Sequence, residues 1–488
     1  MRKQLHFILL SILLALYSVV CLYAQPDSIS VYQLGEAEVK GNRRIGTSDT
    51  ERFSVGGNTY HTDSTSLSLL RHTSLTELVN TLTPVFVRES GNGMMSSVSL
   101  RGTASSHTVV TWNDIAINSL TMGQTDFNHL PVFFFDNVEV YPGGEGALYG
   151  NGSIGGTISL KTQTWNKEGV GIDFQQMFGS YTNTFSGGKL LFKRNKWSAK
   201  TALLYQYSKN DFKFRNDAVD GFPTQKQNNS SYDKFGVLQE VYYNPSNRST
   251  VSAKIWYMNF YREIQPMKSA NNLPRQYDTI HDRNLLSIVN FNHRADWVQL
   301  SVSAGYLYDR QLFQNDVIAT NRFVGCAEGE KQLFKALTVK VGAYAEYVVP
   351  DVYAYNDDVT EWRGDVYALF RYDINQRLEA SLNLRQSFVS RLSPPFTPSA
   401  GIAYRLIDSD KNSLKIRSTL AKSFRAPTLN DRYWGSSINS NLQSETGVNI
   451  EAGLDYSFNT LPFRIEAQAT VFRNKVDNWI LCLPRGNI

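Results

Sequence analysis

The chain has 488 residues, of which 42% are hydrophobic and 12% aromatic, and its mean hydropathy is −0.32. This length allows several ordinary domains, or one small domain joined to a very large one. The hydropathy and the lack of a later apolar stretch of roughly 20 residues argue against a helical membrane protein. The formal net charge of +5 comes from 49 basic and 44 acidic residues, and it gives no sign of nucleic-acid binding.

The segment 1–24 is predicted to be a cleaved secretory signal peptide. Two basic residues precede an apolar run, Phe7 to Tyr23, as signal peptides require. A membrane-anchoring helix and lipidation at Cys21 are the less favoured alternatives. After cleavage only Cys326 and Cys482 remain, so an exported protein of this composition is not held together by a disulfide framework.

The region 60–164 is predicted to form a small α+β domain, preceded by a polar arm, 25–59. In this region Ser74 and Glu77 have the spacing of a capping box, and apolar residues recur on one helical face as far as Leu82. Short predicted strands follow, at 84–88, 95–101 and 108–112. The arm itself contains one potential strand, around 36–40.

A glycine-rich stretch lies between two short alternating runs, Val138 to Tyr141 and Thr157 to Lys161. Seven of the fourteen residues from Gly143 to Gly156 are glycine, a residue that allows close approach of two backbones. The six residues from Gly150 to Gly155 match the dinucleotide fingerprint G-x-G-x-x-G. That fingerprint requires a helix after the glycines, and an alternating strand pattern follows here, so we reject a nucleotide site.

From about residue 165 the chain changes to long segments of alternating polarity, for example from Trp197 to Tyr207. The longer runs reach about 11 or 12 residues, which exceeds a usual soluble strand and matches a tilted membrane-spanning strand. Short turns alternate with longer polar loops, a pattern typical of outer-membrane barrels. A secreted β-sandwich or propeller is the alternative interpretation.

No pattern in the sequence predicts catalysis, a resident cofactor or a metal site. The seven histidines are scattered, and no nucleophile elbow or pair of catalytic carboxylates is evident. Asp357 and Asp358 could contribute to calcium binding, but a solvated turn is the favoured interpretation. An enzyme therefore has little support.

Three segments resemble the TonB-dependent outer-membrane receptors. The segment 100–118, LRGTASSHTVVTWNDIAIN, and the segment 138–162, VEVYPGGEGALYGNGSIGGTISLKT, are similar to the plug domain of that family. The segment 421–434, AKSFRAPTLNDRYW, is similar to one of its barrel segments. EAEVKGNR, at 36–43, lies where the energy-coupling TonB box would be. The resemblance covers essentially the whole chain after the signal peptide.

The resemblance implies a mainly β fold, in which the plug lies inside a large antiparallel transmembrane β-barrel of the class with about 22 strands. The protein would be integral to the outer membrane, with plug and arm facing the periplasm. The segment 165–488, however, supplies only about 15 or 16 candidate strands, and its last residues lack a terminal aromatic strand. We therefore expect a partial barrel, a C-terminally truncated fragment of the family's fold.

The resemblance also implies partners and function: TonB would pull the arm, and a small metal chelate would bind outside, between plug and barrel loops. The predicted TonB-coupling residues are Glu36, Ala37, Glu38, Val39 and Lys40, which could engage TonB by strand addition. The plug motif is most similar to that of the cobalamin receptors, which favours import of a corrinoid. Ferric siderophores, haem, or a truncated copy without transport activity are the alternatives.

The predicted ligand contacts at the plug apex are Thr103, Ser105, Ser106, His107 and Asn118. The alternative is that the two serines satisfy a tight turn and that the histidine is merely an exposed loop residue. The protein is expected to act as a monomer or with a surface lipoprotein.

A second group of residues is expected to join the plug to the barrel: Arg101, Gly102, Tyr149, Gly150, Gly155 and Gly156. Arg101 would pair with a carboxylate of the barrel wall such as Glu379 or Glu466. The glycine-rich hairpin would close the plug where it meets the barrel.

Overall fold

The computed structural model describes residues 49–266, 278–355, 358–409, 411–435, 441–460 and 463–481. The predicted signal peptide and the TonB-box-like segment 36–43 lie outside the described residues. They belong to a separate unit, Met1–Thr47, so the description below concerns the unit Ser48–Ile488 alone. None of the helices among the described residues is long and apolar enough to cross a membrane.

The first part of this unit is a small domain, the plug, built on a five-stranded sheet with the order β1-β6-β7-β4-β5. Its strands pair antiparallel except β4 and β7, which are parallel. The sheet strands are β1 (Tyr60–His61), β4 (Thr108–Trp112), β5 (Ile115–Ala116), β6 (Asn137–Pro142) and β7 (Gly156–Lys161). A separate hairpin contains β2 (Phe86–Glu89) and β3 (Ser96–Ser99), and the α-helices are α2 (Asp49–Phe53), α3 (Ser64–Leu69), α4 (Leu75–Leu82) and α5 (Gly146–Tyr149).

Helix α4 confirms the helix predicted from apolar spacing, and it buries Leu75, Leu78 and Val79. The predicted capping box is wrong, because the Ser74 side chain makes no capping hydrogen bond. Its hydroxyl instead donates to Asn128 Oδ1 at 2.8 Å, and the Leu75 N–H donates to the Leu130 carbonyl. Tertiary partners thus satisfy the groups that a local cap would have satisfied.

The rest of the unit is one antiparallel sheet of fifteen strands, the wall, in which each strand pairs with its neighbours along the chain. Its strands are β8 (Gly169–Gly179), β9 (Asn183–Arg194), β10 (Trp197–Ser208), β13 (Tyr232–Ser246), β14 (Ser249–Glu263), β15 (Thr279–Arg294), β16 (Gln299–Phe313), β17 (Asp316–Phe334), β18 (Leu337–Val352), β19 (Glu361–Asp373), β20 (Leu378–Val389), β21 (Thr397–Asp408), β22 (Asn412–Arg425), β23 (Glu445–Thr460) and β24 (Phe463–Asp477). Strands β11 (Lys213–Arg215) and β12 (Thr224–Lys226) form a small hairpin in the loop after β10.

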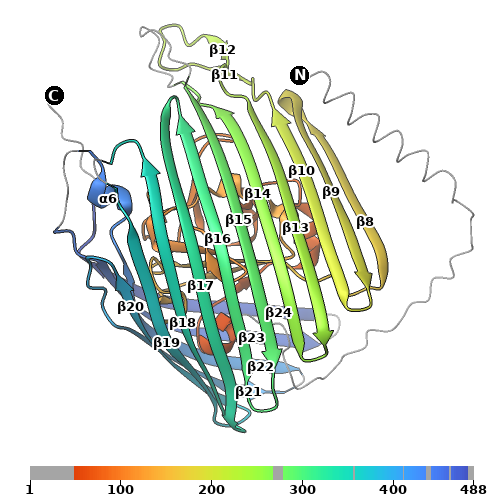
Figure 1. The fold of residues 1–488 in the computed structure, drawn as a ribbon, viewed down its shortest axis with the longest axis vertical. Coiled ribbons are helices and arrows are strands. Elements are labelled where there is room, and N and C mark those ends of the chain that lie inside the picture. The colour runs from red at the N-terminus through yellow and green to blue at the C-terminus, as the bar shows by residue number, and fades with distance from the viewer. Residues whose placement is uncertain are drawn as a thin grey trace, which may run out of the picture. The chain divides into compact units, whose positions relative to one another are not determined.

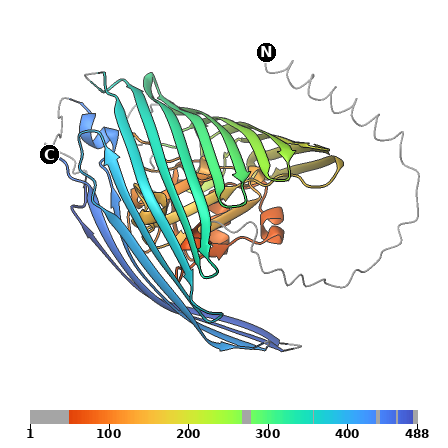
Figure 2. The same cartoon turned by 60° about the horizontal axis from the view of Figure 1, so that its bottom comes forward.

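The wall curves around the plug, which lies against its concave face (Figures 1 and 2). Within the described residues β8 and β24 are the two edges of the wall. The expectations of a mainly β fold, a small α+β domain and a large antiparallel sheet of about fifteen strands are confirmed. Strand lengths of 11 to 19 residues also agree with the long alternating runs in the sequence.

The two faces of the wall differ as the alternation predicts. On β10, Leu203 and Tyr205 point outward and are 48% and 42% exposed, whereas Lys200 and Leu204 face the plug and are buried. The inward face is thus not uniformly polar, because part of it packs on the plug rather than on water. The outward face is apolar along most strands, and this suits contact with lipid.

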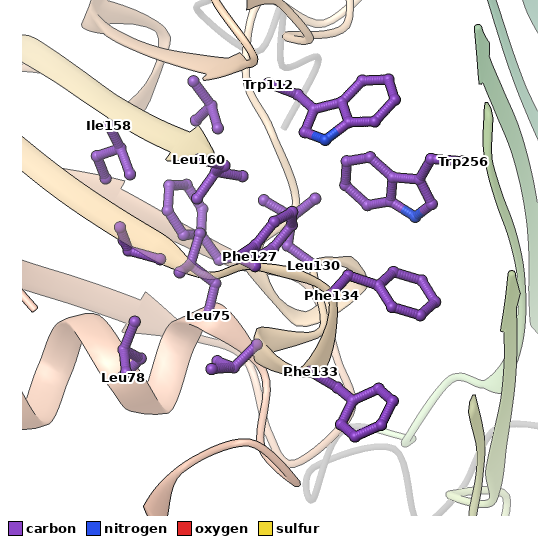
Figure 3. Close-up of a cluster of buried hydrophobic side chains, with 14 of the residues drawn as sticks. Leu75, Leu78, Trp112, Phe127, Leu130, Phe133, Phe134, Ile158, Leu160 and Trp256 are labelled. Atoms are coloured by element: carbon purple, nitrogen blue, oxygen red, sulfur yellow. The ribbon is translucent and has the colours of Figure 1, made fainter. Parts of the chain in front are cut away.

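Plug and wall share one hydrophobic core. Trp256 of β14 reaches from the wall into this core and meets Trp112 of β4 edge to face, with ring centroids 5.5 Å apart (Figure 3). Phe134, in a short 3₁₀ turn of the plug, meets the same indole at 6.3 Å. Aromatic contacts of this geometry add about 1 kcal/mol each to the burial of the rings, so this core anchors the plug on the wall.

At the glycine-rich hairpin the plug lies directly against the backbone and side chains of the wall. A Cβ placed on Gly146 of α5 would lie 2.6 Å from Ser423 Cα and 2.7 Å from the Lys422 carbonyl oxygen, both in β22. A Cβ on Gly144 would lie 2.1 Å from the Asn449 side chain of β23. Any larger residue at these two positions would therefore collide with the wall, so glycine is needed there for packing as well as for the turn.

The first prediction tests this packing with Gly146→Ala. Alanine favours a helix by about 1 kcal/mol over glycine, yet we expect the variant to be less stable by roughly 1–3 kcal/mol, because the clash is with wall backbone. The urea midpoint of the detergent-solubilised protein and the trypsin resistance of the plug report the change. Gly188→Ala is the control, since its Cβ would meet nothing within 4 Å. Equal stability of the two variants would contradict the packing argument.

Candidate functional site

The candidate site lies where two plug loops meet the wall segment after β22. One loop contains the 3₁₀ turn Ser105–His107, and the other is the segment 118–125. The Leu429 N–H, at the start of α6 (Leu429–Tyr433), donates to the Leu120 carbonyl at 3.0 Å. The three loops therefore form one surface at the end of the plug, which we call the apex.

Ser105 and Ser106 are half-buried at the apex. The Ser105 hydroxyl donates to Gln124 Oε1 at 2.6 Å, which ties the two plug loops together. Gly123, at φ 74°, lies between Ser106 and Thr428, because a Cβ there would be 3.5 Å from Ser106 and 2.7 Å from Thr428. Hydroxyl and amide groups thus converge at this point.

His107 is completely buried, unlike an exposed loop residue. Its Nε2 lies 2.7 Å from a carboxylate oxygen of Glu445 in β23, and Arg425 donates to the same oxygen. Its Nδ1 accepts from the Ala104 N–H, and the Trp479 ring meets the imidazole in an edge-to-face arrangement, with ring centroids 4.9 Å apart. With both ring nitrogens engaged, the imidazole fastens the apex to the wall.

The side chains of Thr103 and Asn118 form hydrogen bonds with backbone groups of the plug. The Thr103 hydroxyl donates to the Leu100 carbonyl, and Gly155 packs against it. The Asn118 side chain accepts from the Val110 N–H and donates to the Thr108 carbonyl, so its amide holds the loop onto β4. Of the five predicted ligand contacts, Thr103 and His107 are buried, whereas Ser105, Ser106 and Asn118 are half-buried, and Ser106 and Asn118 line a cavity between the plug and the wall.

A cavity of about 200 Å³ extends from the apex between the plug and the wall. At the apex it is lined by Ser106 and Gly123, and elsewhere by Asp49 at the start of the plug and Glu328 of β17. Its wall side carries four arginines, Arg322, Arg363, Arg385 and Arg425. Among the described residues no group of three His, Cys, Asp or Glu side chains could hold a metal ion.

Arg101, with φ 52°, lies at the plug–wall boundary. Its guanidinium is 2.6 Å from Glu451 of β23, and Arg417 of β22 donates to the same carboxylate at 2.5 Å. The suggested partners were wrong, since Glu379 pairs with Arg371 and Arg405, and Glu466 with Arg464. Inward-facing carboxylates on neighbouring strands look alike in sequence, and only the register distinguishes them.

The remaining predicted junction residues also lie at or near this boundary. Tyr149 shares a 2.5 Å hydrogen bond with Thr50, and a Cβ on Gly150 would be 3.3 Å from Arg385 and Asp365. Gly155 and Gly156 pack within the plug, against Thr103 and the Tyr141 carbonyl respectively, whereas a Cβ on Gly102 would meet nothing within 4 Å. Gly102 instead allows the backbone to adopt a positive φ of 75° at this position.

Sequence reasoning missed a clamp formed by residues 49–57, in the stretch assigned to the polar arm. Asp49 receives a 2.6 Å bond from Lys340 of β18, Arg52 pairs with Glu330, and Phe53 is fully buried. Backbone carbonyls of the clamp accept from Arg371, Asn383 and Arg417 of the wall. The isolated inward-facing cations of the wall strands were the signal that could have predicted these partners.

Glu145 joins the clamp to the glycine-rich hairpin. Ser54 donates to its carboxylate at 2.5 Å, in a site where the residue is only 9% exposed. Burial, together with the nearby Glu451 carboxylate, raises the pKa of Glu145 to about 7, and Arg101 opposes the increase. Deprotonation of Glu145 therefore destabilises the plug in its position against the wall.

Two family models match most of the chain. A model described as TonB dependent receptor-like, beta-barrel, matches residues 111–488, and the TonB-dependent Receptor Plug Domain matches residues 52–157. The chain is 26% identical over 436 residues to the vitamin B12 transporter BtuB of Photobacterium profundum, covering 84% of this chain and 66% of that protein. The corresponding protein of Vibrio vulnificus is 24% identical over 438 residues, with 86% and 67% covered. The chain thus spans about two thirds of the length of these relatives.

Solved structures agree on the fold. A variant of the ferric enterobactin receptor PfeA of Pseudomonas aeruginosa superposes with a TM-score of 0.68 at 13% identity, covering 88% of this chain and 72% of that one. The ferric yersiniabactin uptake receptor FyuA of Yersinia pestis gives a TM-score of 0.65 at 14% identity, with 88% and 73% covered. At such identities the likeness concerns the fold alone.

A prediction on pH follows from Glu145. A carboxyl whose pKa is higher in the folded protein binds its proton more tightly there, so stability falls as pH rises from about 4.5 to about 7. By pH 8 the ionised group costs roughly 3 kcal/mol. We expect Glu145→Gln to be the more stable protein at pH 8 and to lose this part of the pH dependence. Urea midpoints at pH 5 and pH 8 test it, with the exposed Glu77→Gln as control; a wild-type protein that tracks Glu145→Gln at both pH values would contradict it.

The Arg101–Glu451 pair predicts strong coupling between plug and wall. Arg101→Gln removes one of the two cations that share the buried Glu451 carboxylate and leaves Arg417 as its partner, so we expect a loss of roughly 1–3 kcal/mol. A double-mutant cycle with Glu451→Gln should give a coupling of roughly 1–3 kcal/mol, read from urea midpoints. Arg88→Gln, at an exposed plug arginine, should change stability by less than about 0.5 kcal/mol. Additive single-mutant effects would show that the pair does not hold the plug.

Proposed function

The chain belongs to the TonB-dependent receptor family, and on that premise we propose that it imports a scarce metal-containing nutrient across the bacterial outer membrane. A cobalamin-like corrinoid is the favoured ligand. The family consists of receptors and transporters rather than enzymes, which agrees with the lack of catalytic motifs. The coupling partner in this proposal is TonB.

The position and the chemistry of the apex support the proposed ligand. Two of its three loops lie within the matched plug region, and two relatives that match more than four fifths of this chain are named vitamin B12 transporters. Ser105, Ser106 and Gln124 bring hydroxyl and amide groups together there. Such groups suit a corrinoid, whose periphery carries amide side chains that both donate and accept hydrogen bonds.

The clamp supports a role for the arm in coupling. Residues 49–57 belong to the described part of the arm, on the C-terminal side of Glu36–Lys40, and they are bonded to the wall through Lys340, Asn383 and Arg417. A pull on the arm would reach these bonds before the rest of the plug. The clamp is therefore where we propose that work done on the arm first loosens the plug.

The outward face of the wall supports the proposed location. Leu203, Ile255 and Val289, on three different strands, are among many large apolar side chains that are about half exposed there. Burial of this surface in hydrocarbon is strongly favourable, so we propose an integral outer-membrane protein with plug and arm on the periplasmic side. Its action as a monomer, or together with a surface lipoprotein, remains a prediction.

The proposal is tested by uptake in a host that has TonB but lacks its own cobalamin receptor. We expect the chain to support uptake of labelled cobalamin, and deletion of Glu36–Lys40 to abolish it. Replacing Ser105, Ser106 and Gln124 by alanine should weaken cobalamin binding at least about tenfold, since a hydrogen bond contributes about 1 kcal/mol.

The same strains are given ferric siderophores and haem, and binding is measured in detergent. Uptake of one of these ligands in place of cobalamin would reassign the substrate while keeping the transport function. Binding without uptake, or no binding of any ligand, would overturn the proposal that the chain transports.

A further inference from the structure

Seven short connections between wall strands lie at one end of the wall, and each has at least one exposed basic side chain in it or beside it. These connections join β9–β10, β13–β14, β15–β16, β17–β18, β19–β20, β21–β22 and β23–β24. The exposed basic residues in or within three positions of them, which we call the basic rim, are Arg194, Lys196, Arg248, Arg294, Lys335, Arg377, Lys411 and Arg464.

Short turns do not by themselves require such cations. Two connections at the opposite end are equally short, Ser180–Thr182 between β8 and β9, and 314–315 between β16 and β17. Neither has a Lys or Arg within three residues, and the second is followed by Asp316. Among the short turns, exposed positive charge thus accompanies those at one end of the wall and not the two at the opposite end.

Few acidic groups offset the rim. The described acidic residues in the same stretches are Asp296, Asp373, Glu379 and Asp408. The first three are already paired with arginines, Asp296 with Arg248 at 2.8 Å and the other two with Arg371. The side chains of Arg194, Arg294, Lys335, Arg377 and Lys411 make no ion pair or hydrogen bond with another described residue. Their charge is therefore available to a partner.

Exposed aromatic side chains accompany the rim. Trp297 is 67% and Phe334 is 70% exposed, and Trp197 stacks on Tyr243 with ring centroids 4.4 Å apart. Lys331 lies over the Trp297 ring at 5.7 Å. Aromatic rings next to cations are typical of the boundary between hydrocarbon and lipid headgroups.

We propose that the basic rim binds the anionic headgroups of the phospholipid leaflet at the short-turn end of the wall. Successive short turns are two strands apart, about 10 Å, which is close to the Debye length at physiological salt, so their potentials overlap into a continuous positive band. Lys and Arg donors meet the phosphate oxygens while the neighbouring rings enter the acyl boundary. A soluble phosphate would not need the rings. This inference rests on the proposed membrane location and adds the lipid class.

The test uses the full chain in neutral detergent with brominated phosphatidylglycerol or brominated phosphatidylcholine, which quench tryptophans that they contact. The signal from the rim is the difference between the wild type and Trp297→Phe. We expect phosphatidylglycerol to quench Trp297 at a concentration at least about tenfold lower than phosphatidylcholine, and added salt to reduce the difference. The triple variant Arg294→Gln, Lys331→Gln and Lys335→Gln should lose most of the preference.

The matched control removes three basic residues from the opposite end, Lys213→Gln, Arg215→Gln and Lys226→Gln, and should keep the preference. Trypsin resistance of the plug shows that each variant is folded. Equal quenching by the two lipids, or an equal loss in the control, would overturn the inference while leaving the membrane location intact. Absence of quenching by either lipid would instead count against the membrane location itself.

Discussion

The seating of the plug depends on charges that are buried between it and the wall. Glu451 receives Arg101 from the plug and Arg417 from the wall, and Arg417 also donates to the Gly56 carbonyl of the clamp. Removing ions from water costs several kcal/mol each, and only complete pairing offsets that cost. Such an interface is satisfied in one register only, so the charges specify the position of the plug more than they stabilise it.

The interface has two parts of different character. The buried apolar cluster reaches wall strands from β9 to β17, with Trp256 at its centre, whereas strands β17 to β23 hold the clamp and the hairpin mainly through hydrogen bonds and ion pairs. Water can replace hydrogen bonds at a small net cost, but it cannot replace apolar contacts. The cavity lies along the polar part, lined by Arg322 and Arg385 among others. The polar side is therefore the one at which the plug can separate from the wall at least cost.

The strands and α4 could be predicted from sequence because alternation and helical spacing are local properties. Pairing across the interface could not, because many inward positions are chemically equivalent: Glu451 rather than Glu379 or Glu466 receives Arg101. Full burial of His107 was unpredictable for the same reason, as its partner Glu445 is more than three hundred residues away in the chain. The clamp was not predicted because its few apolar residues form no local pattern and become buried only by packing against the wall.

The glycine-rich hairpin, finally, sets the distance between plug and wall. The Gly152 N–H donates to the Phe424 carbonyl of β22 at 2.8 Å, and Asn449 of β23 donates to the Ile154 carbonyl. Such direct bonds from hairpin backbone to wall form only where no side chain separates the two surfaces. Glycine loses more conformational entropy on folding than any other residue, and these bonds and the buried pairs beside them offset that loss. Since His107 accepts the Gly155 N–H on its carbonyl, the same spacing also fixes the height of the apex. A feature that in sequence indicated only tight folding thus determines where the proposed ligand surface lies.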